Sequence, residues 1–76
     1  MAHHHYKRYI ICWNTNKSLF TCHIHSSSHS LEEAIEEMKR FGNTCKKPYK
    51  AMWIEDSKNG SAVASYDKDC KEVTLW

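Results

Sequence analysis

Apolar residues in the middle of the chain recur with helical spacing. They occupy positions i, i+3, i+4, i+7 and i+10, and they are Leu31, Ala34, Ile35, Met38 and Phe41. This spacing places them on one face of a helix. Ser30 and Glu33 have the Ser-x-x-Glu spacing of a capping box, in which each side chain bonds to the other's backbone N–H. Gly42-Asn43 favours a stop, because both residues tolerate a left-handed backbone. The pattern predicts an amphipathic helix from Leu31 to this stop.

Shorter apolar runs on both sides of the helix predict strands. Residues 8–14 and 18–25 flank the turn-forming sequence Asn-Thr-Asn-Lys at 14–17. Residues 49–56 and 61–66 flank Asn59-Gly60, a strong hairpin signal because both residues tolerate positive φ. Residues 72–76 add a short final strand. The predicted element order is therefore β-β-α-β-β with a fifth strand at the end.

Paired strands around one helix predict an α+β domain of two layers. In this fold class a single antiparallel-rich sheet carries one amphipathic helix on one face. A ubiquitin-like β-grasp is similar in element order. The chain has 76 residues, which leaves no room for a second domain of at least about 50 residues. We assign residues 6–76 to this single domain and interpret residues 1–5, Met-Ala-His-His-His, as a tag remnant or a disordered N-terminus.

Neither face of the predicted sheet is cleanly polar. Period-two alternation sets Met52, Ile54 and Val63 opposite Trp53 and Tyr66 in the second hairpin. One helix covers one face only, and a contiguous exposed apolar patch marks an interaction site. The alternative is a slipped register, or a loop that folds back over that face. We predict a partner-binding aromatic platform that consists of Tyr9, Ile11, Trp13, Trp53 and Tyr66.

Composition supports the assignment of aromatic residues to a second surface. Ile, Leu, Val and Phe together make up only about 16% of the chain, whereas it contains three Trp and four Tyr. A domain of this size gains only about 3–5 kcal/mol from one core. A twofold dimer is an economical way to cover an apolar face. We therefore expect a small interaction module that binds a protein partner or a second copy of itself.

The signatures of common enzymes are missing from the sequence. Two glycines do not make a Gly-rich phosphate loop, and neither Cys-x-x-Cys nor Gly-x-Ser-x-Gly occurs. A chain this short also has little material to enclose a pocket of about 300 Å³ or more. We expect no enzymatic activity and no cofactor.

A run of cations supports binding of RNA or single-stranded DNA as an alternative. Residues 38–50 contain five Lys or Arg residues and no acid. The candidate contacts are Lys46, Lys47, Tyr49 and Lys50, with Tyr9 or Trp13 available to stack on bases. The sequence pI of about 8.4 is below the level typical of nucleic-acid domains. A solvated lysine loop explains the same run.

A second alternative is a mini-domain stabilised by zinc. The weak candidate ligands are Cys22, His23, His25 and His29, of which the last two have the H-x3-H spacing of a zinc finger. Nine residues separate Cys12 from Cys22, however, where a zinc finger has two to four. Surface histidines on a strand account for the same residues, so we predict no metal site.

The four cysteines and the lack of long apolar runs indicate where in the cell the protein is located. No run approaches the roughly 18 residues of a membrane span, and no secretory signal precedes the domain. We therefore expect a cytoplasmic protein with reduced thiols.

Overall fold

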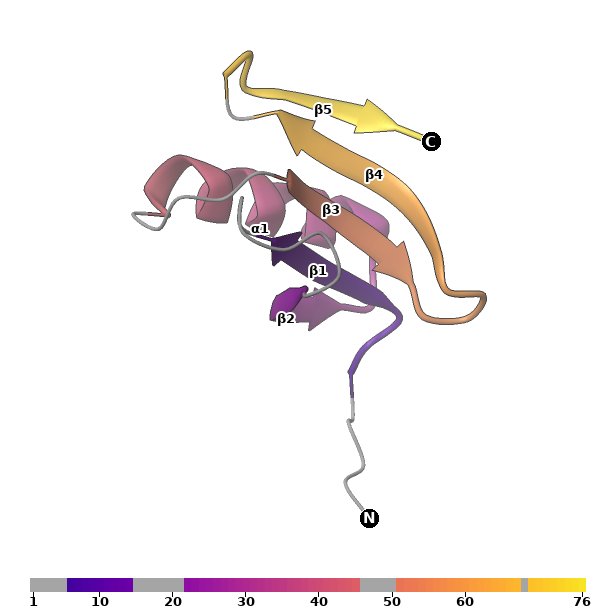
Figure 1. The fold of residues 1–76 in the computed structure, drawn as a ribbon. Coiled ribbons are helices and arrows are strands. Elements are labelled where there is room, and N and C mark those ends of the chain that lie inside the picture. The colour runs from indigo at the N-terminus through magenta and orange to yellow at the C-terminus, as the bar shows by residue number, and fades with distance from the viewer. Residues whose placement is uncertain (1–5, 15–21, 46–50, 68) are drawn as a thin grey trace.

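A computed structural model describes residues 6–14, 22–45, 51–67 and 69–76 of the chain. The elements, in chain order, are β1 (Tyr9–Asn14), β2 (His23–Ser28), α1 (Leu31–Thr44), β3 (Ala51–Asp56), β4 (Ser61–Asp67) and β5 (Glu72–Leu75). The strands form one antiparallel sheet in the order β2-β1-β3-β4-β5, and α1 packs on one face of it (Figure 1). The predicted α+β class, element order and final strand are confirmed.

The apolar stripe of α1 forms the helical side of the core. Ala34 and Met38 are fully buried, while Leu31, Ile35 and Phe41 are partly buried against the core. The predicted stripe is therefore confirmed, because each of its residues packs under the sheet.

The predicted ends of the helix are wrong in detail. Ser30 stands at the N-cap position with an extended backbone, but its side chain makes no cap hydrogen bond, so no capping box forms. Glu32 and Glu33 in the first turn still complement the positive end of the helix dipole. At the other end, the helix continues past Gly42 to Thr44, and the Cys45 N–H donates to the Phe41 carbonyl at 2.8 Å.

Contacts from the last turn explain why the helix continues past the glycine. The Tyr66 hydroxyl on β4 donates a 2.7 Å hydrogen bond to Asn43 Oδ1. The Thr44 hydroxyl donates to the Arg40 carbonyl at 2.8 Å. The Tyr66 bond satisfies the side chain of Asn43, which the sequence assigns to the stop, so a tertiary contact overrides the local preference.

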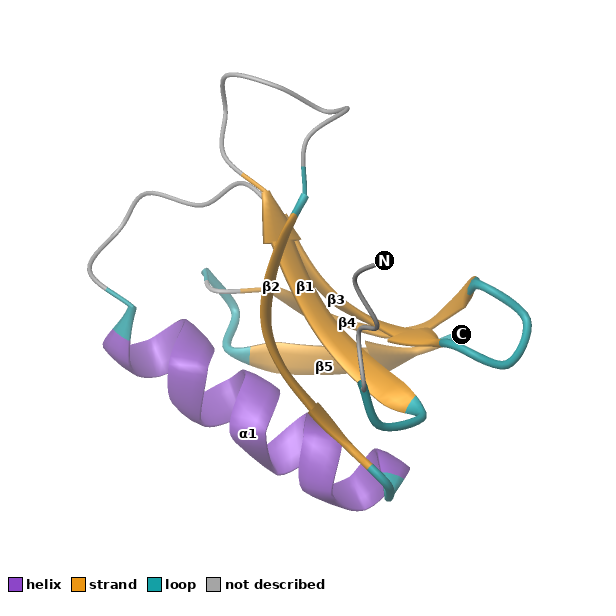
Figure 2. Cartoon of the chain, turned by 90° about the horizontal axis from the view of Figure 1, so that it is seen from below, coloured by secondary structure: helices purple, strands orange, loops and turns teal. Residues whose placement is uncertain are grey.

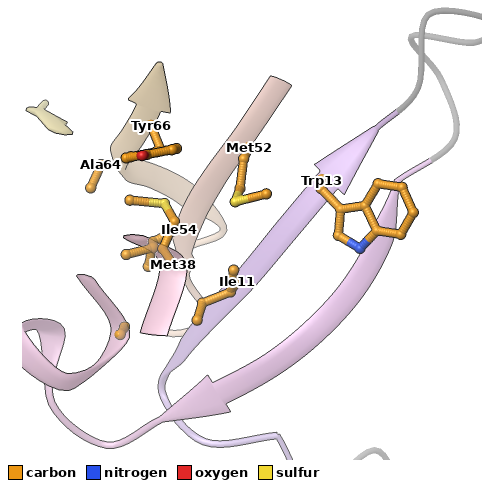
Figure 3. Packing of buried hydrophobic residues seen from close by; sticks show 8 residues of the cluster. Ile11, Trp13, Met38, Met52, Ile54, Ala64 and Tyr66 are labelled. Carbon is orange, nitrogen blue, oxygen red and sulfur yellow. The ribbon is translucent and has the colours of Figure 1, made fainter. Parts of the chain in front are cut away.

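The core lies between α1 and one face of the sheet. Its sheet side consists of Ile11, Trp13, Met52, Ile54, Ala64 and Tyr66, which lie together in Figure 3 with Met38 from the helix. Trp13 and Tyr66 are therefore core residues. The aromatic side chains supply the apolar volume that the small number of Leu, Ile and Val leaves missing.

A β-bulge corrects the predicted faces of the second hairpin. Ile54 pairs with Ala64 whereas Glu55 pairs with Ala62, so Val63 is the extra residue. Without the bulge, Val63 would stand opposite Ile54, as the alternation predicts. The one-residue shift instead brings Ala64 and Tyr66 onto the helix-covered face with Ile54.

The first hairpin also differs from the prediction. Its second strand spans His23–Ser28 and not 18–25, and Trp13 pairs with His23. The predicted turn at 14–17 and residues 18–21 lie largely outside the described residues. β2 is an edge strand, and its last three residues are serines. An edge strand does not need a continuous apolar face, so period-two alternation is a poor guide to its position.

Candidate protein-interaction surfaces

The structure does not bring the predicted aromatic platform together as one exposed face. Ile11, Trp13 and Tyr66 are buried beneath α1, and Tyr9 packs partly buried against the same core. Trp53 lies on the opposite face, because it is adjacent in sequence to the core residues of β3. The prediction of this exposed surface is wrong, since the helix covers the aromatic side of the sheet.

Trp13 is held by rings from two other elements. The centroid of its ring lies 4.5 Å from that of His23 on β2, in a stacked arrangement. Phe41 of α1 approaches it from the helix side, with 5.9 Å between centroids. Trp13 is 8% exposed, which leaves no open ring face for a nucleic-acid base to stack on.

The face of the sheet opposite α1 has a small apolar centre. Cys12 lies there between Ile24 of β2 and Trp53 of β3, which are its neighbours in the register. Ile24 is exposed and Trp53 is half-buried, with its indole N–H donating to Glu55 Oε1 at 3.0 Å. This face is less apolar than the sequence predicts, because the bulge in β4 moves Tyr66 to the other side.

The Cys12 thiol is buried and unreactive. Burial is the largest cause that raises its pKa to about 12, and the Glu55 carboxylate and the Cys22 thiol make smaller contributions to the same shift. Its Sγ donates a weak 3.9 Å hydrogen bond to the Ile10 carbonyl. A thiol is a nucleophile only after it loses its proton, so Cys12 is protonated and unreactive at neutral pH.

β5 forms one edge of the sheet and carries exposed apolar residues. It pairs with β4, and no strand lies on its other side among the described residues. Leu75 is 65% exposed and Trp76 is 76% exposed. The Trp76 N–H donates to the Val63 carbonyl at 3.0 Å, which fixes the backbone at this position. The edge is therefore an extended strand with exposed apolar side chains at its C-terminal end.

The opposite edge, β2, forms one wall of a groove. The groove has a volume of about 910 Å³, and α1 forms its other wall. Its lining residues are His25, Ser26, Ser27 and Ser28 from β2 and Glu32, Glu33, Ile35, Glu36, Glu37 and Arg40 from α1. The sequence prediction missed this groove. The signal that was available is the run of serines directly before a helix with four glutamates.

One histidine joins the two walls of the groove. His25 Nε2 lies 2.8 Å from Glu37 Oε2, and its ring stacks on Phe41 with 3.9 Å between centroids. Arg40 also lies 3.5 Å from Glu37. These contacts hold β2 against the helix and fix the width of the groove on the His25 side.

The weak zinc-ligand candidates point in different directions. His23 stacks on Trp13, His25 bonds to Glu37, and Cys22 interacts with Cys12. His29 is exposed before the helix. Within the ranges that the structure describes, no three His, Cys, Asp or Glu side chains gather where they could hold a metal ion. The structure therefore does not bring these four residues together.

The candidate nucleic-acid contacts Lys46, Lys47, Tyr49 and Lys50 lie outside the described residues. Of the two aromatic residues proposed to stack, Trp13 is buried. The Tyr9 ring is half-buried and has the Arg8 guanidinium 5.1 Å from its centroid.

A buried carboxylate anchors the end of β3. Arg8 binds Asp56 through two bonds, from Nε to Oδ1 at 3.1 Å and from an NH group to Oδ2 at 2.9 Å. The Lys58 backbone N–H donates to the same carboxylate at 3.0 Å. The hydrogen bonds from Arg8 lower the pKa of Asp56 below its ordinary value of 3.8, and the bond from Lys58 adds to the shift. The pair joins the start of β1 to the β3–β4 turn.

We expect Asp56→Asn to lower the free energy of unfolding at neutral pH and to have progressively less effect in acid. A carboxyl group with a depressed folded pKa contributes stability above its unfolded value of about 4, and this is lost as the pH falls through the folded value. Urea denaturation from about pH 7 to about pH 2 measures the difference between variant and wild type. The exposed Asp69→Asn is the control. A difference that does not change with pH would contradict the charge-based explanation.

Comparisons with protein-family models, with characterised proteins and with solved structures each find no match.

The helix and the cysteine thiols add two further features. No helix in the described parts of the chain is long and apolar enough to cross a membrane. Cys12, Cys22 and Cys70 carry free thiols. Asp67 raises the pKa of the exposed Cys70 thiol, with smaller contributions from burial and the other nearby acids.

Proposed function

We propose that this protein is a small interaction module that associates with a second copy of itself through the open edge of β5. The observation that carries the proposal is the exposure of Leu75 on the edge strand β5 and of Trp76 directly after it. An exposed strand edge is a template for pairing with another strand, and exposed large apolar side chains add to that tendency.

The sequence of β5 suits pairing with itself about a twofold axis. If the axis passes through Thr74, antiparallel pairing sets Val73 opposite Leu75 of the second copy and Glu72 opposite Trp76. Val73 and Leu75 share one face of the strand, so they form two symmetric apolar pairs. No charge faces a like charge across this pairing, which would otherwise be unfavourable.

The helix leaves room for this contact. α1 packs over β1, β2, β3 and β4, so β5 stands apart from it at the edge of the sheet (Figure 1). Apolar side chains of the second copy would cover Leu75. The strand is short, so the buried area falls toward the low end of specific interfaces, below about 1,200 Å². A weak dimer is expected.

Sedimentation velocity over a range of concentrations up to about 1 mM tests the proposal, because weak interfaces need high concentration. The wild type should shift from monomer to dimer as concentration rises. Leu75→Lys should remain a monomer, since a lysine on an edge strand opposes pairing. Ile24→Lys is the matched control, because it places the same charge at an exposed apolar position on the other edge.

Two outcomes would overturn the proposal. One is a wild type that stays monomeric at every concentration, in which case β5 would be open for a different protein to bind. The other is a Leu75→Lys variant that dimerises as the wild type does. Far-UV circular dichroism confirms that each variant retains the fold.

A further inference from the structure

We propose that the groove between β2 and α1 binds an extended peptide segment rich in lysine and arginine, which adds as a strand to β2. This site lies on the opposite edge of the sheet from β5 and does not depend on self-association. Figure 2 shows β2 at the rim of the sheet, converging with α1 where the chain passes from strand to helix.

The backbone of β2 supplies the first part of the site. β2 pairs with β1 on one side only, among the residues that the structure describes. Alternate N–H and C=O groups along its outer side therefore point away from the sheet. Strand addition uses such groups for main-chain hydrogen bonds, which give affinity for any extended peptide.

The serines of β2 keep this backbone accessible. Ser26, Ser27 and Ser28 line the groove, and their side chains are too small to cover the strand. The Ser26 hydroxyl oxygen is buried and has no hydrogen-bond partner among the residues that the structure describes. A buried hydroxyl without a partner costs free energy, and a polar group entering the groove can satisfy it. The wall is thus built to accept a polar ligand.

The helix supplies the charge. Glu32, Glu33 and Glu36 are exposed along the wall of the groove, and Glu37 is the fourth acid on that wall. Arg40 is the one Lys or Arg among the described residues that line the groove, and it lies beside Glu37. The groove is negative, so it disfavours phosphate and attracts cations. The described acids do not converge as a metal site, which favours a ligand with spaced positive charges.

The two walls together specify a pattern in the ligand. In a strand, every second side chain points to the same face. A peptide paired with β2 therefore directs alternate residues toward α1, where long cationic side chains reach the exposed glutamates. Charge-assisted bonds to carboxylates select lysine or arginine at those positions. The remaining positions of the peptide face away from the helix and are unconstrained.

Fluorescence anisotropy with a labelled peptide of alternating lysine and threonine tests the proposal in the full chain. The wild type should bind it, with affinity that falls as salt rises. The double variant Glu32→Lys and Glu36→Lys should weaken binding at least about tenfold, because both changes reverse charge on the groove wall. Asp69→Lys is the control, since it reverses an exposed acid in the turn before β5, outside both the groove and the proposed self-association pairing.

A second peptide separates strand addition from simple charge attraction. A version with the threonines replaced by proline keeps the charges but loses the backbone donors at those positions. It should bind at least about tenfold more weakly than the original peptide. In ¹H–¹⁵N spectra, the original peptide should shift the amide signals of His23 to Ser28.

Three results would overturn the proposal. They are equal binding by the double variant and the wild type, equal weakening by Asp69→Lys, and equal binding of the proline peptide. The second would indicate attraction to net charge alone, and the third would exclude strand pairing. Each outcome is independent of whether β5 pairs with a second copy.

Discussion

Replacing Trp13 with alanine is expected to lower the free energy of unfolding by about 3–5 kcal/mol. The side chain is 8% exposed and is packed between His23 and Phe41, so its removal leaves a cavity where β1, β2 and α1 meet. A domain of this size has a free energy of unfolding of only about 3–5 kcal/mol. We therefore expect the variant to be largely unfolded at room temperature, as measured by far-UV circular dichroism and urea denaturation.

Trp76→Ala is the matched control for this experiment. Trp76 is 76% exposed, so its truncation should change the free energy of unfolding by no more than about 0.5 kcal/mol. The measurement is made at low concentration, where the chain is monomeric, because Trp76 belongs to the proposed self-association edge. Equal losses for the two tryptophans would contradict the placement of Trp13 in the core.

Replacing Met38 with alanine is expected to cost about 2–5 kcal/mol. Met38 is fully buried at the centre of the helix stripe and packs in the same cluster as Met52 and Ile54 of β3. Its loss removes the main apolar contact that holds α1 on the sheet. Thermal and urea denaturation followed by circular dichroism measure the change.

Two further variants separate volume from other effects at this position. Met38→Leu nearly conserves volume and should cost less than about 1.5 kcal/mol. Lys39→Ala changes the exposed neighbour and should stay within about 0.5 kcal/mol of the wild type. A Met38→Ala variant as stable as Lys39→Ala would show that α1 does not depend on this contact.

The helix was predictable from the sequence because its signal is local. Leu31, Ala34 and Phe41 follow the helical period over more than two turns, and packing confirms the face they define. The second hairpin was predictable in outline for the same reason, since Asn59-Gly60 places its turn. Gly60 has a φ of 73°, in the region that the turn signal anticipates.

The faces of the sheet were not predictable, because they depend on single-residue shifts. The extra residue Val63 turns Tyr66 from one face to the other, and alternation contains no signal for it. The sequence also does not state which of two apolar faces the helix covers. The sequence is therefore compatible with Trp13 on the surface or in the core, and the position of α1 decides between the two.

The β2–α1 groove was missed because its strand has no apolar alternation. Ser26, Ser27 and Ser28 have the composition of a loop, and they become a strand through pairing with β1. Glu32 and Glu33 suit the first turn of a helix by themselves, and only the tertiary fold sets which strand lies beside them. The candidate site becomes visible only when the edge strand and the helix are seen together.

The strand order has a consequence for avidity. Because β2 and β5 lie at opposite edges, a pair of chains joined at β5 would continue as one ten-stranded sheet with a groove at each end. With strands about 4.8 Å apart, the two grooves would be separated by on the order of 40 Å. A ligand with two basic segments joined by a linker of that reach would bind both ends at once. Its second segment would bind at a high effective concentration, so a weak dimer and a weak peptide site could together hold such a ligand tightly.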